Sequence, residues 1–180
     1  MNDLDVMILD RTKAGKALLS KNSKITHAVS IFDASTFAGY RPNAKPAAGF
    51  YWFKGKKLAC QFDDVTREDT GYVACTDEHV QALIDFGNVL RKDLEKQACN
   101  LLVHCHAGIS RSTASAFTIL CIVYGAGREE EAIKKVFDVR PIAYPNERLV
   151  AIADRLLGRN GVMVATVQPY LNRIKDTYQW

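Results

Sequence analysis

The chain has 180 residues, of which 48% are hydrophobic and 24% are charged, and its formal net charge at pH 7 is +4. At roughly 150 residues per domain this length predicts a single domain over 1–180, with a core that needs no disulfide or metal staples. The composition excludes a fibrous or largely disordered chain, and the mild basic excess is too small to indicate a nucleic-acid partner.

Strand and helix patterns alternate along the chain. Short apolar runs predict strands at residues 5–9, 27–32, 58–62 and 100–104. Amphipathic or apolar stretches predict helices at 12–19, 77–96, 112–124, 128–139 and 146–157. This alternation predicts an α/β fold with a central, mainly parallel sheet and helices on both faces.

Two regions outside these elements carry open predictions. Residues 33–57 are expected to be loop-like, with a hairpin strand at the aromatic run 50–53; a loop on the substrate side of a pocket is the alternative. The extension 159–180 is of uncertain structure, and Pro169 is a candidate start for a last short helix.

Apolar runs and cysteine usage both bear on the compartment of the protein. No apolar run reaches the roughly 18 residues that span a membrane, and the acidic start of the chain lacks the layout of a signal peptide, so no membrane partner is expected. Five cysteines occur without a CxxC pair: Cys60, Cys75, Cys99, Cys105 and Cys121. The sequence therefore predicts free thiols in a reducing, cytoplasmic compartment, with most of them packed as small hydrophobes.

The segment most informative about chemistry is residues 104–112, His-Cys-His-Ala-Gly-Ile-Ser-Arg-Ser, between a predicted strand and a predicted helix. In open α/β folds ligands bind at this edge of the sheet, and a helix N-terminus attracts anions. The N–H groups that can surround an anion here are those of His106, Ala107, Gly108, Ile109, Ser110 and Arg111. The Arg111 guanidinium adds a fork for two phosphate oxygens, so the segment predicts a phosphate-binding loop.

Cys105 begins this loop at the end of the predicted strand. The positive field of the helix N-terminus and of Arg111 favours the thiolate, which is the nucleophilic form of cysteine. Gly108 permits the sharp turn that brings the backbone close to the anion. Ser112 is placed to donate a hydrogen bond to the cysteine sulfur and to help it leave in a second step.

Together these residues resemble the signature of the cysteine-dependent protein tyrosine phosphatases, in which His-Cys is followed by five residues, Arg and Ser. The ending Ser-Arg-Ser-Thr is similar to the compact dual-specificity and bacterial branch. The resemblance covers roughly residues 58–158 and includes Arg-Pro at 140–141 and Pro-Asn at 145–146. It implies a phosphocysteine intermediate on Cys105, phosphate held by Arg111 and the loop amides, a phosphorylated protein or peptide as partner, and no cofactor or obligatory metal.

The resemblance also implies an Asp that acts as general acid and then as general base. Compact members carry it after the strand that precedes the long helix, which points to Asp63 or Asp64. Asp64 is preferred because the family places its Asp directly before an aliphatic residue, here Val65. The spacing to Cys105 is longer than in compact members, so Asp69 stays open together with Asp63.

Other functions also use such a loop. A phosphoinositide phosphatase is expected to carry Lys inside the loop, and residues 106–110 contain none. A sulfur-transfer enzyme needs no Asp acid, and a phospho-residue binding module that has lost catalysis would lack the Cys, Arg or Asp present here. His104 and His106 form a His-x-His pattern without further ligands at metal-binding spacing, so no metal site is predicted, and His104 is expected to support the loop through a backbone hydrogen bond.

Overall fold

The computed structural model describes residues 2–34, 45–68 and 71–178, so Asp69 lies outside the described residues. Four parallel strands form one sheet in the order β1-β4-β2-β3. The strands are β1 (Leu4–Leu9), β2 (His27–Phe32), β3 (Lys56–Gln61) and β4 (Cys99–His104). The helices are α1 (Arg11–Leu19), α2 (Asp77–Leu94), α3 (Arg111–Tyr124), α4 (Glu129–Val139), α5 (Glu147–Leu156) and α6 (Val162–Tyr178). The prediction of an α/β fold with a parallel sheet is confirmed.

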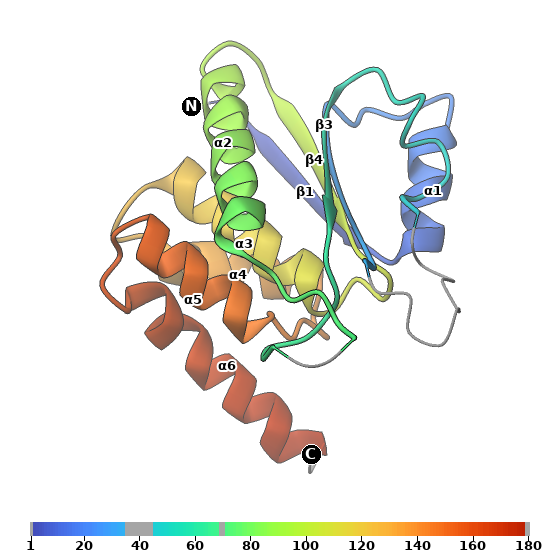
Figure 1. Ribbon diagram of the computed structural model, residues 1–180. Helices are drawn as coiled ribbons and strands as arrows, with labels where there is room; N and C mark the ends of the chain where they lie inside the picture. Colours follow the sequence, from blue (N-terminus) through green and yellow to red (C-terminus); the bar gives the residue numbers. More distant parts are fainter. Residues whose placement is uncertain (1, 35–44, 69–70, 179–180) are drawn as a thin grey trace.

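Helices cover both faces of this sheet, as predicted. Figure 1 shows α1 on one face and the other helices gathered on the opposite face. Because successive strand residues point to opposite faces, β4 serves two cores. Leu101 and Val103 belong to the larger core, and Leu102 packs in a smaller core with Ala14 of α1 and Phe50.

Helix α3 occupies the centre of the larger layer, and its residues from Arg111 to Val123 are all buried. It starts directly after the loop that follows β4, so its buried N-terminus opens at the carboxyl edge of the sheet. This explains why the stretch is apolar on most sides rather than on one stripe. In the part of the chain that the structure describes, no helix is both long and apolar enough to cross a membrane.

The carboxyl ends of the four strands meet at one edge because all strands are parallel. Leu9 at the end of β1 pairs with His104 at the end of β4, and Phe32 of β2 pairs with Gln61 of β3. The residues that follow these ends are Asp10, Asp33, Asp63 with Asp64, and Cys105. Segments far apart in the sequence therefore come together where the phosphate-binding loop was predicted.

The predicted hairpin strand at residues 50–53 is wrong, because residues 50–52 form a turn and residue 53 belongs to no strand. Phe50 is buried in the smaller core, whereas Tyr51 and Trp52 are 68% and 75% exposed. The Lys57 ammonium donates to the carbonyl groups of Phe50, Tyr51 and Phe53, which closes the turn. An aromatic run alone does not distinguish a strand from a turn that anchors one ring.

The predicted helix start at Pro169 is also wrong, because α6 begins at Val162 and Pro169 lies inside it. The Asp154 carboxylate accepts from N–H groups at the start of α6, including that of Met163 at 2.7 Å. Met163, Val167 and Leu171 are buried along one face of the helix. Their burial offsets the interior proline, which costs about 3 kcal/mol in a helix.

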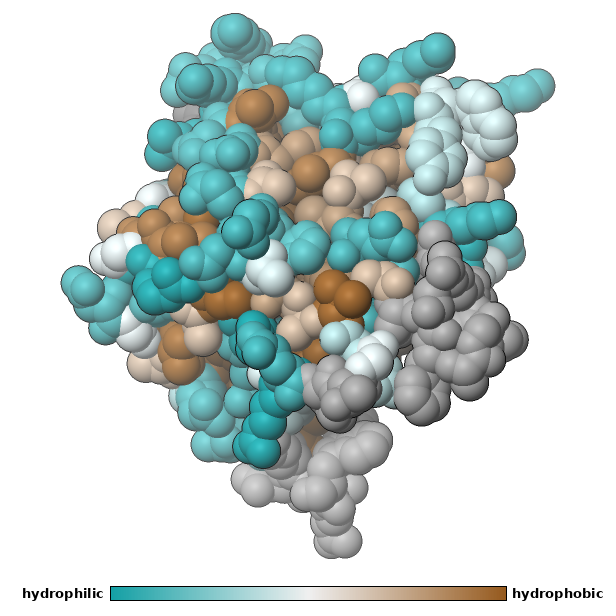
Figure 2. All heavy atoms as spheres, in the orientation of Figure 1, coloured by the Kyte–Doolittle hydropathy of each residue, from teal (hydrophilic) through white to brown (hydrophobic). Residues whose placement is uncertain are grey.

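The surface on the α2 side of the molecule is mixed in character. Figure 2 shows apolar side chains there in several patches that are divided by hydrophilic ones. Most of the large apolar side chains of the helices lie inside the larger core instead. This face therefore offers no single continuous apolar surface.

Candidate active site

The loop 105–110 between β4 and α3 is held from outside by donors that bind its carbonyl groups. The Arg140 guanidinium donates from Nε to Gly108 O at 2.8 Å and from Nη2 to Ala107 O at 2.9 Å. The backbone N–H of Arg11, at the start of α1, donates to His106 O at 3.1 Å. Three consecutive carbonyl groups thus point away from the centre of the loop.

The second half of the loop is held in the same way. Ile109 O accepts from the Tyr144 N–H at 2.9 Å, and Ser110 O accepts from the Thr113 hydroxyl at 2.8 Å. In a trans peptide the C=O of one residue and the N–H of the next point in opposite directions. With carbonyl groups 106 to 110 directed outward, the N–H groups that follow them face inward and form an anion-binding nest.

Gly108 is required at its position for two reasons. Its φ of +70° lies in the left-handed region, which L side chains rarely adopt. A Cβ at this position would lie 2.5 Å from the carbonyl carbon of Leu9 and 2.7 Å from the backbone nitrogen of Asp10. The loop therefore docks directly on the end of β1, at a distance that only glycine permits.

The sulfur of Cys105 lies at the floor of this loop. The Gly108 N–H donates to Cys105 Sγ at 3.2 Å, and Ser112 Oγ lies 3.2 Å from the same sulfur. Cys105 is buried, with 1% of its surface exposed. Both neighbours can donate a hydrogen bond to this sulfur.

Arg111 at the first turn of α3 is fixed through one nitrogen. Its Nη1 donates to Asp33 Oδ1 at 2.7 Å and to Phe62 O at 2.7 Å. Its Nε is buried, lies 3.6 Å from Asp64 Oδ2 and makes no hydrogen bond to the described residues. The guanidinium is thus oriented by Nη1, and its Nε edge remains for a ligand. Asp33 was not predicted, and its only signal is its position directly after β2.

Asp63 joins two segments of the backbone. It is buried, and its carboxylate accepts from the Ala34 N–H at 3.0 Å and from the Val73 N–H at 2.7 Å. It therefore joins the segments that follow β2 and β3. Both carboxylate oxygens of Asp63 are thus engaged by backbone N–H groups.

Asp64 lies at the rim of the loop, with 37% of its side chain exposed. Its Oδ1 accepts from the Ser110 hydroxyl at 2.6 Å and from the Asn146 amide at 3.0 Å. Asn146 is itself fixed, because its Oδ1 caps α5 by accepting from the Leu149 N–H. The downstream Pro-Asn pair thus positions the preferred Asp, a link that spacing alone does not show.

His104 is buried behind the cysteine. Burial lowers its pKa to about 4, and the positive charge of Arg11 acts in the same direction. The ring is therefore neutral near pH 7, and its Nδ1 donates to Cys105 O at 3.3 Å, the backbone contact expected for this residue. His106 is exposed instead, and the described residues contain no group of three side chains that could hold a metal ion.

The other four cysteines confirm the prediction of packed free thiols. Cys60, Cys75, Cys99 and Cys121 are all buried and unpaired with one another. Burial raises the pKa of Cys60 and of Cys75 to about 12, and it also raises the pKa of Cys121. These thiols stay protonated near neutral pH, so they do not compete as nucleophiles.

No family model matches the sequence, and no curated protein matches it. Solved structures do resemble the fold. Human DUSP28 superimposes with a TM-score of 0.56 at 18% identity, over 87% of this chain and 94% of that one. The Yvh1 phosphatase domain from Chaetomium thermophilum gives 0.54 at 22% identity, over 91% and 95%. PTPMT1 in complex with PI(5)P gives 0.54 at 15% identity, over 86% and 91%.

These similarities extend over most of both chains in each case. At such low identity they establish architecture rather than activity. The chain has the fold of the dual-specificity phosphatases.

Proposed function

We propose that this protein is a phosphatase of phosphoproteins that works through a phosphocysteine intermediate on Cys105, with phosphotyrosine as its principal substrate. The observation that carries the proposal is the position of Cys105 Sγ, 3.2 Å from the Gly108 N–H, beneath a loop whose carbonyl groups at 106–110 accept hydrogen bonds from outside the loop. A phosphate seated among the inward N–H groups and the Nε edge of Arg111 would present phosphorus to the sulfur. Phosphoserine and phosphothreonine are further candidate substrates.

In the first step the Cys105 sulfur forms a bond to phosphorus while the bond from phosphorus to the ester oxygen breaks. Asp64 transfers its proton to that leaving oxygen. In the second step the Asp64 carboxylate takes a proton from water, the water oxygen bonds to phosphorus, and the bond from phosphorus to sulfur breaks. Ser112 Oγ, 3.2 Å from the sulfur, donates to the departing thiolate.

The contacts of Asp64 support its role as acid and base. In the structure its Oδ2 lies 3.6 Å from Arg111 Nε, the atom that the proposal assigns to phosphate. A bound phosphate would replace the Asp64 carboxylate as the neighbour of Arg111 Nε. Asp64 would then lie next to the bound ester, at the position from which the first step transfers its proton.

The substrate class is proposed from the loop itself. PTPMT1, one of the similar structures, is in complex with the phosphoinositide PI(5)P. Residues 106–110 of this chain contain no Lys or Arg that would bind the additional phosphates of an inositol ring.

The proposed location of the protein is the cytoplasm, and its free cysteines fit that reducing compartment.

The proposal is tested by turnover and binding together. Wild-type protein should hydrolyse a small aryl phosphate and a phosphotyrosine peptide, and Cys105→Ser should abolish turnover while it retains binding of the peptide. Binding without turnover in the wild type would identify a phospho-residue binding module instead. Faster turnover of inositol phosphates than of phosphopeptides would overturn the assigned substrate class.

A further inference from the structure

Positive charge is concentrated in one part of the chain. Residues 11–62 contain ten Lys or Arg residues and one acidic residue, whereas the rest of the chain carries fourteen Lys or Arg residues and nineteen acidic ones. The described residues of this part form α1, β2, β3 and the turn at 50–52. The net charge of +4 is therefore the sum of a basic region and an acidic remainder.

The end of α1 and the turn at 50–52 lie next to each other near the amino-terminal edge of the sheet. A Cβ at Gly49, directly before the turn, would lie 2.8 Å from the Leu19 side chain. The Lys56 N–H, at the start of β3, donates to Thr26 O, directly before β2, at 3.0 Å. The segments 19–26 and 49–56 therefore form one continuous surface, on the sheet face that carries α1 (Figure 1).

Two kinds of exposed side chain occupy this surface. Large apolar side chains are 59% exposed at Leu19, 68% at Tyr51 and 75% at Trp52. Three exposed lysines lie in the same two segments and make no ion pair with the described residues. We call these six residues the lysine–aromatic surface: Leu19, Lys21, Lys24, Tyr51, Trp52 and Lys54.

The carboxylates closest to the lysine–aromatic surface are engaged elsewhere. Asp93 lies 3.0 Å from His27 Nε2 and pairs with the Lys56 ammonium, so Lys56 is not counted among the three lysines. Asp33, the single acidic residue of 11–62, follows β2 at the opposite edge of the sheet and accepts from Arg111 there. The charge of the three lysines is therefore not compensated by neighbouring carboxylates.

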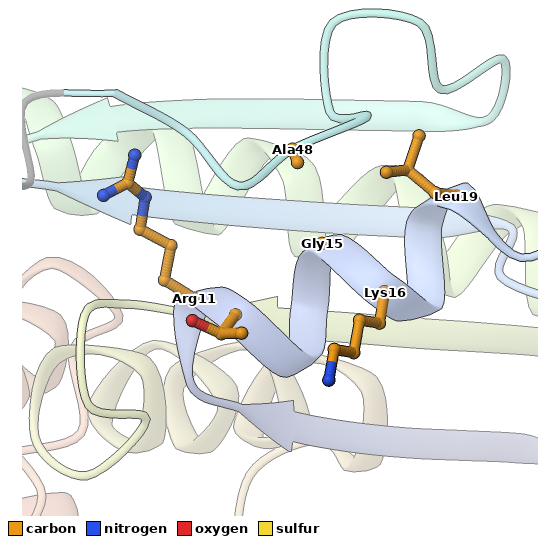
Figure 3. A pocket seen from close by; sticks show the side chains of 6 residues that line it. Arg11, Gly15, Lys16, Leu19 and Ala48 are labelled. Carbon is orange, nitrogen blue, oxygen red and sulfur yellow. The ribbon is translucent and has the colours of Figure 1, made fainter.

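Helix α1 separates the lysine–aromatic surface from the candidate active site. The Arg11 N–H donates to His106 O of the phosphate-binding loop, so α1 begins at that loop. Figure 3 shows Leu19 at the other end of α1, beyond a pocket of about 370 Å³ at Ala48. The rise of 1.5 Å per residue places Leu19 about 12 Å from the start of the helix. A partner can therefore cover this surface without entering the active site.

The residue types of the lysine–aromatic surface indicate the class of partner. Its cations are all Lys, whereas Arg is the residue enriched at protein interfaces and in specific contacts with nucleic acids. Trp and Tyr place an apolar ring and a polar edge at the boundary between water and lipid, and Lys keeps its ammonium in water above an apolar stem. An exposed Leu beside them has no role in base stacking but fits an acyl layer.

We infer that the lysine–aromatic surface binds the surface of an anionic lipid bilayer, with the two rings and Leu19 at the boundary between headgroups and acyl chains and the lysines against the lipid charges. This inference goes beyond the proposed function and does not rest on it. The expectation of no membrane partner concerned a spanning run, and contact with the surface of a bilayer needs no such run.

The test is sedimentation of the full chain with vesicles of phosphatidylcholine alone and of phosphatidylcholine with about one-third phosphatidylserine. Wild type should bind the anionic vesicles at least about tenfold more tightly, and added salt should weaken this binding by screening. Lys54→Glu should weaken it at least about fivefold, as expected for one lysine at an anionic surface. The matched control Lys134→Glu, at an exposed position of α4, changes the net charge equally and should bind like wild type.

Trp52 provides a local reporter, because the sequence contains one other tryptophan, Trp180. In Trp180→Phe the fluorescence of Trp52 should shift to shorter wavelength when anionic vesicles are added, since the ring leaves water. Trp52→Ala should weaken vesicle binding about tenfold, because a large apolar side chain no longer leaves water. Val162→Ala, at a 47% exposed position of α6, is the matched control and should bind like wild type.

Cys105→Ser should bind anionic vesicles as tightly as wild type, because the inferred surface lies away from the phosphate-binding loop. Vesicle binding therefore tests the inference even if the protein hydrolyses no substrate. Equal binding to both kinds of vesicle, equal losses in Lys54→Glu and Lys134→Glu, or an unshifted Trp52 spectrum would overturn it. Tighter binding of a single-stranded oligonucleotide or of polyglutamate than of anionic vesicles would also overturn it and would identify a nucleic acid or an acidic protein as the partner.

Discussion

Arg111 Nη1 lies 2.7 Å from Asp33 Oδ1, and this ion pair joins the first turn of α3 to the end of β2. The guanidinium is almost fully buried, so its orientation is set by this contact and by Phe62 O. Nε makes no hydrogen bond to the described residues and lies 3.6 Å from Asp64 Oδ2. Asp33 is therefore a positioning residue for the group that we assign to phosphate.

Asp33→Asn should lower kcat/KM for an aryl phosphate about 10–100-fold, since a hydrogen bond to a charged group contributes about 1.5–3 kcal/mol. The affinity for inorganic phosphate should fall by a similar factor because Arg111 loses its orientation. Steady-state kinetics and product inhibition by phosphate measure both effects. Asp85→Asn, at an exposed position on α2, is the control. An unchanged phosphate affinity in Asp33→Asn would contradict the positioning role.

Substitutions of Asp63 and Asp64 should have different effects, the first on the free energy of unfolding and the second on turnover. Asp63→Ala removes the acceptor of two backbone N–H groups and should lower the free energy of unfolding by about 2–4 kcal/mol. Asp64→Ala should change stability little but should slow turnover of substrates with poor leaving groups about 10²–10⁴-fold. Urea denaturation and a series of aryl phosphates measure the two effects. Loss of acid catalysis in Asp63→Ala with unchanged stability would reverse the assignment.

Gly108→Ala should displace the phosphate-binding loop, because its Cβ would meet the backbone at Leu9. Turnover should fall by more than about 100-fold, as expected for a misplacement of the order of 1 Å in an active site. Gly127→Ala is the matched control, with a φ of +82° but no atom within 4 Å of the added Cβ. It should cost about 1–2 kcal/mol of stability and leave turnover unchanged. Equal turnover in both variants would show that the loop tolerates the added methyl group.

His104 should make stability depend on pH. Burial lowers its pKa to about 4 in the folded protein, whereas its ordinary value is 6.5. Between these values only the unfolded chain takes up the proton, so its contribution is intact above pH 6.5 and is lost as the pH falls toward 4. We expect the free energy of unfolding to fall by up to about 3 kcal/mol over this window. Urea denaturation at a series of pH values measures the change.

The control for this pH dependence is His104→Asn, whose amide can donate to the same backbone carbonyl but does not titrate. Its free energy of unfolding should fall less steeply between pH 6.5 and 4. His27 and His79, whose pKa values are also lowered mainly by burial, contribute equally to both proteins. Parallel curves for the two proteins would exclude His104 as the cause.

The sequence predicted those parts of the candidate site in which residues close in the chain are also close in space. The loop after β4 and the N-terminus of α3 are contiguous, so the nest, Cys105 and Arg111 could be predicted together. Asp33 could not, because only the strand order brings the end of β2 to Arg111. The sequence also could not show that backbone N–H groups bind both Asp63 oxygens, because those N–H groups lie on other segments. It could not show that α6 begins before Pro169, because the burial of one helix face outweighs the cost of an interior proline.

The central claim is that Cys105 carries the phosphoryl group during turnover. The most direct measurement is an acid quench of wild-type protein during hydrolysis of a phosphotyrosine peptide, followed by mapping of the phosphate by mass spectrometry. The account predicts a phosphorylated Cys105 that accumulates within the first turnover and is absent from Cys105→Ser. Turnover without such an adduct, or an adduct on another residue, would contradict it.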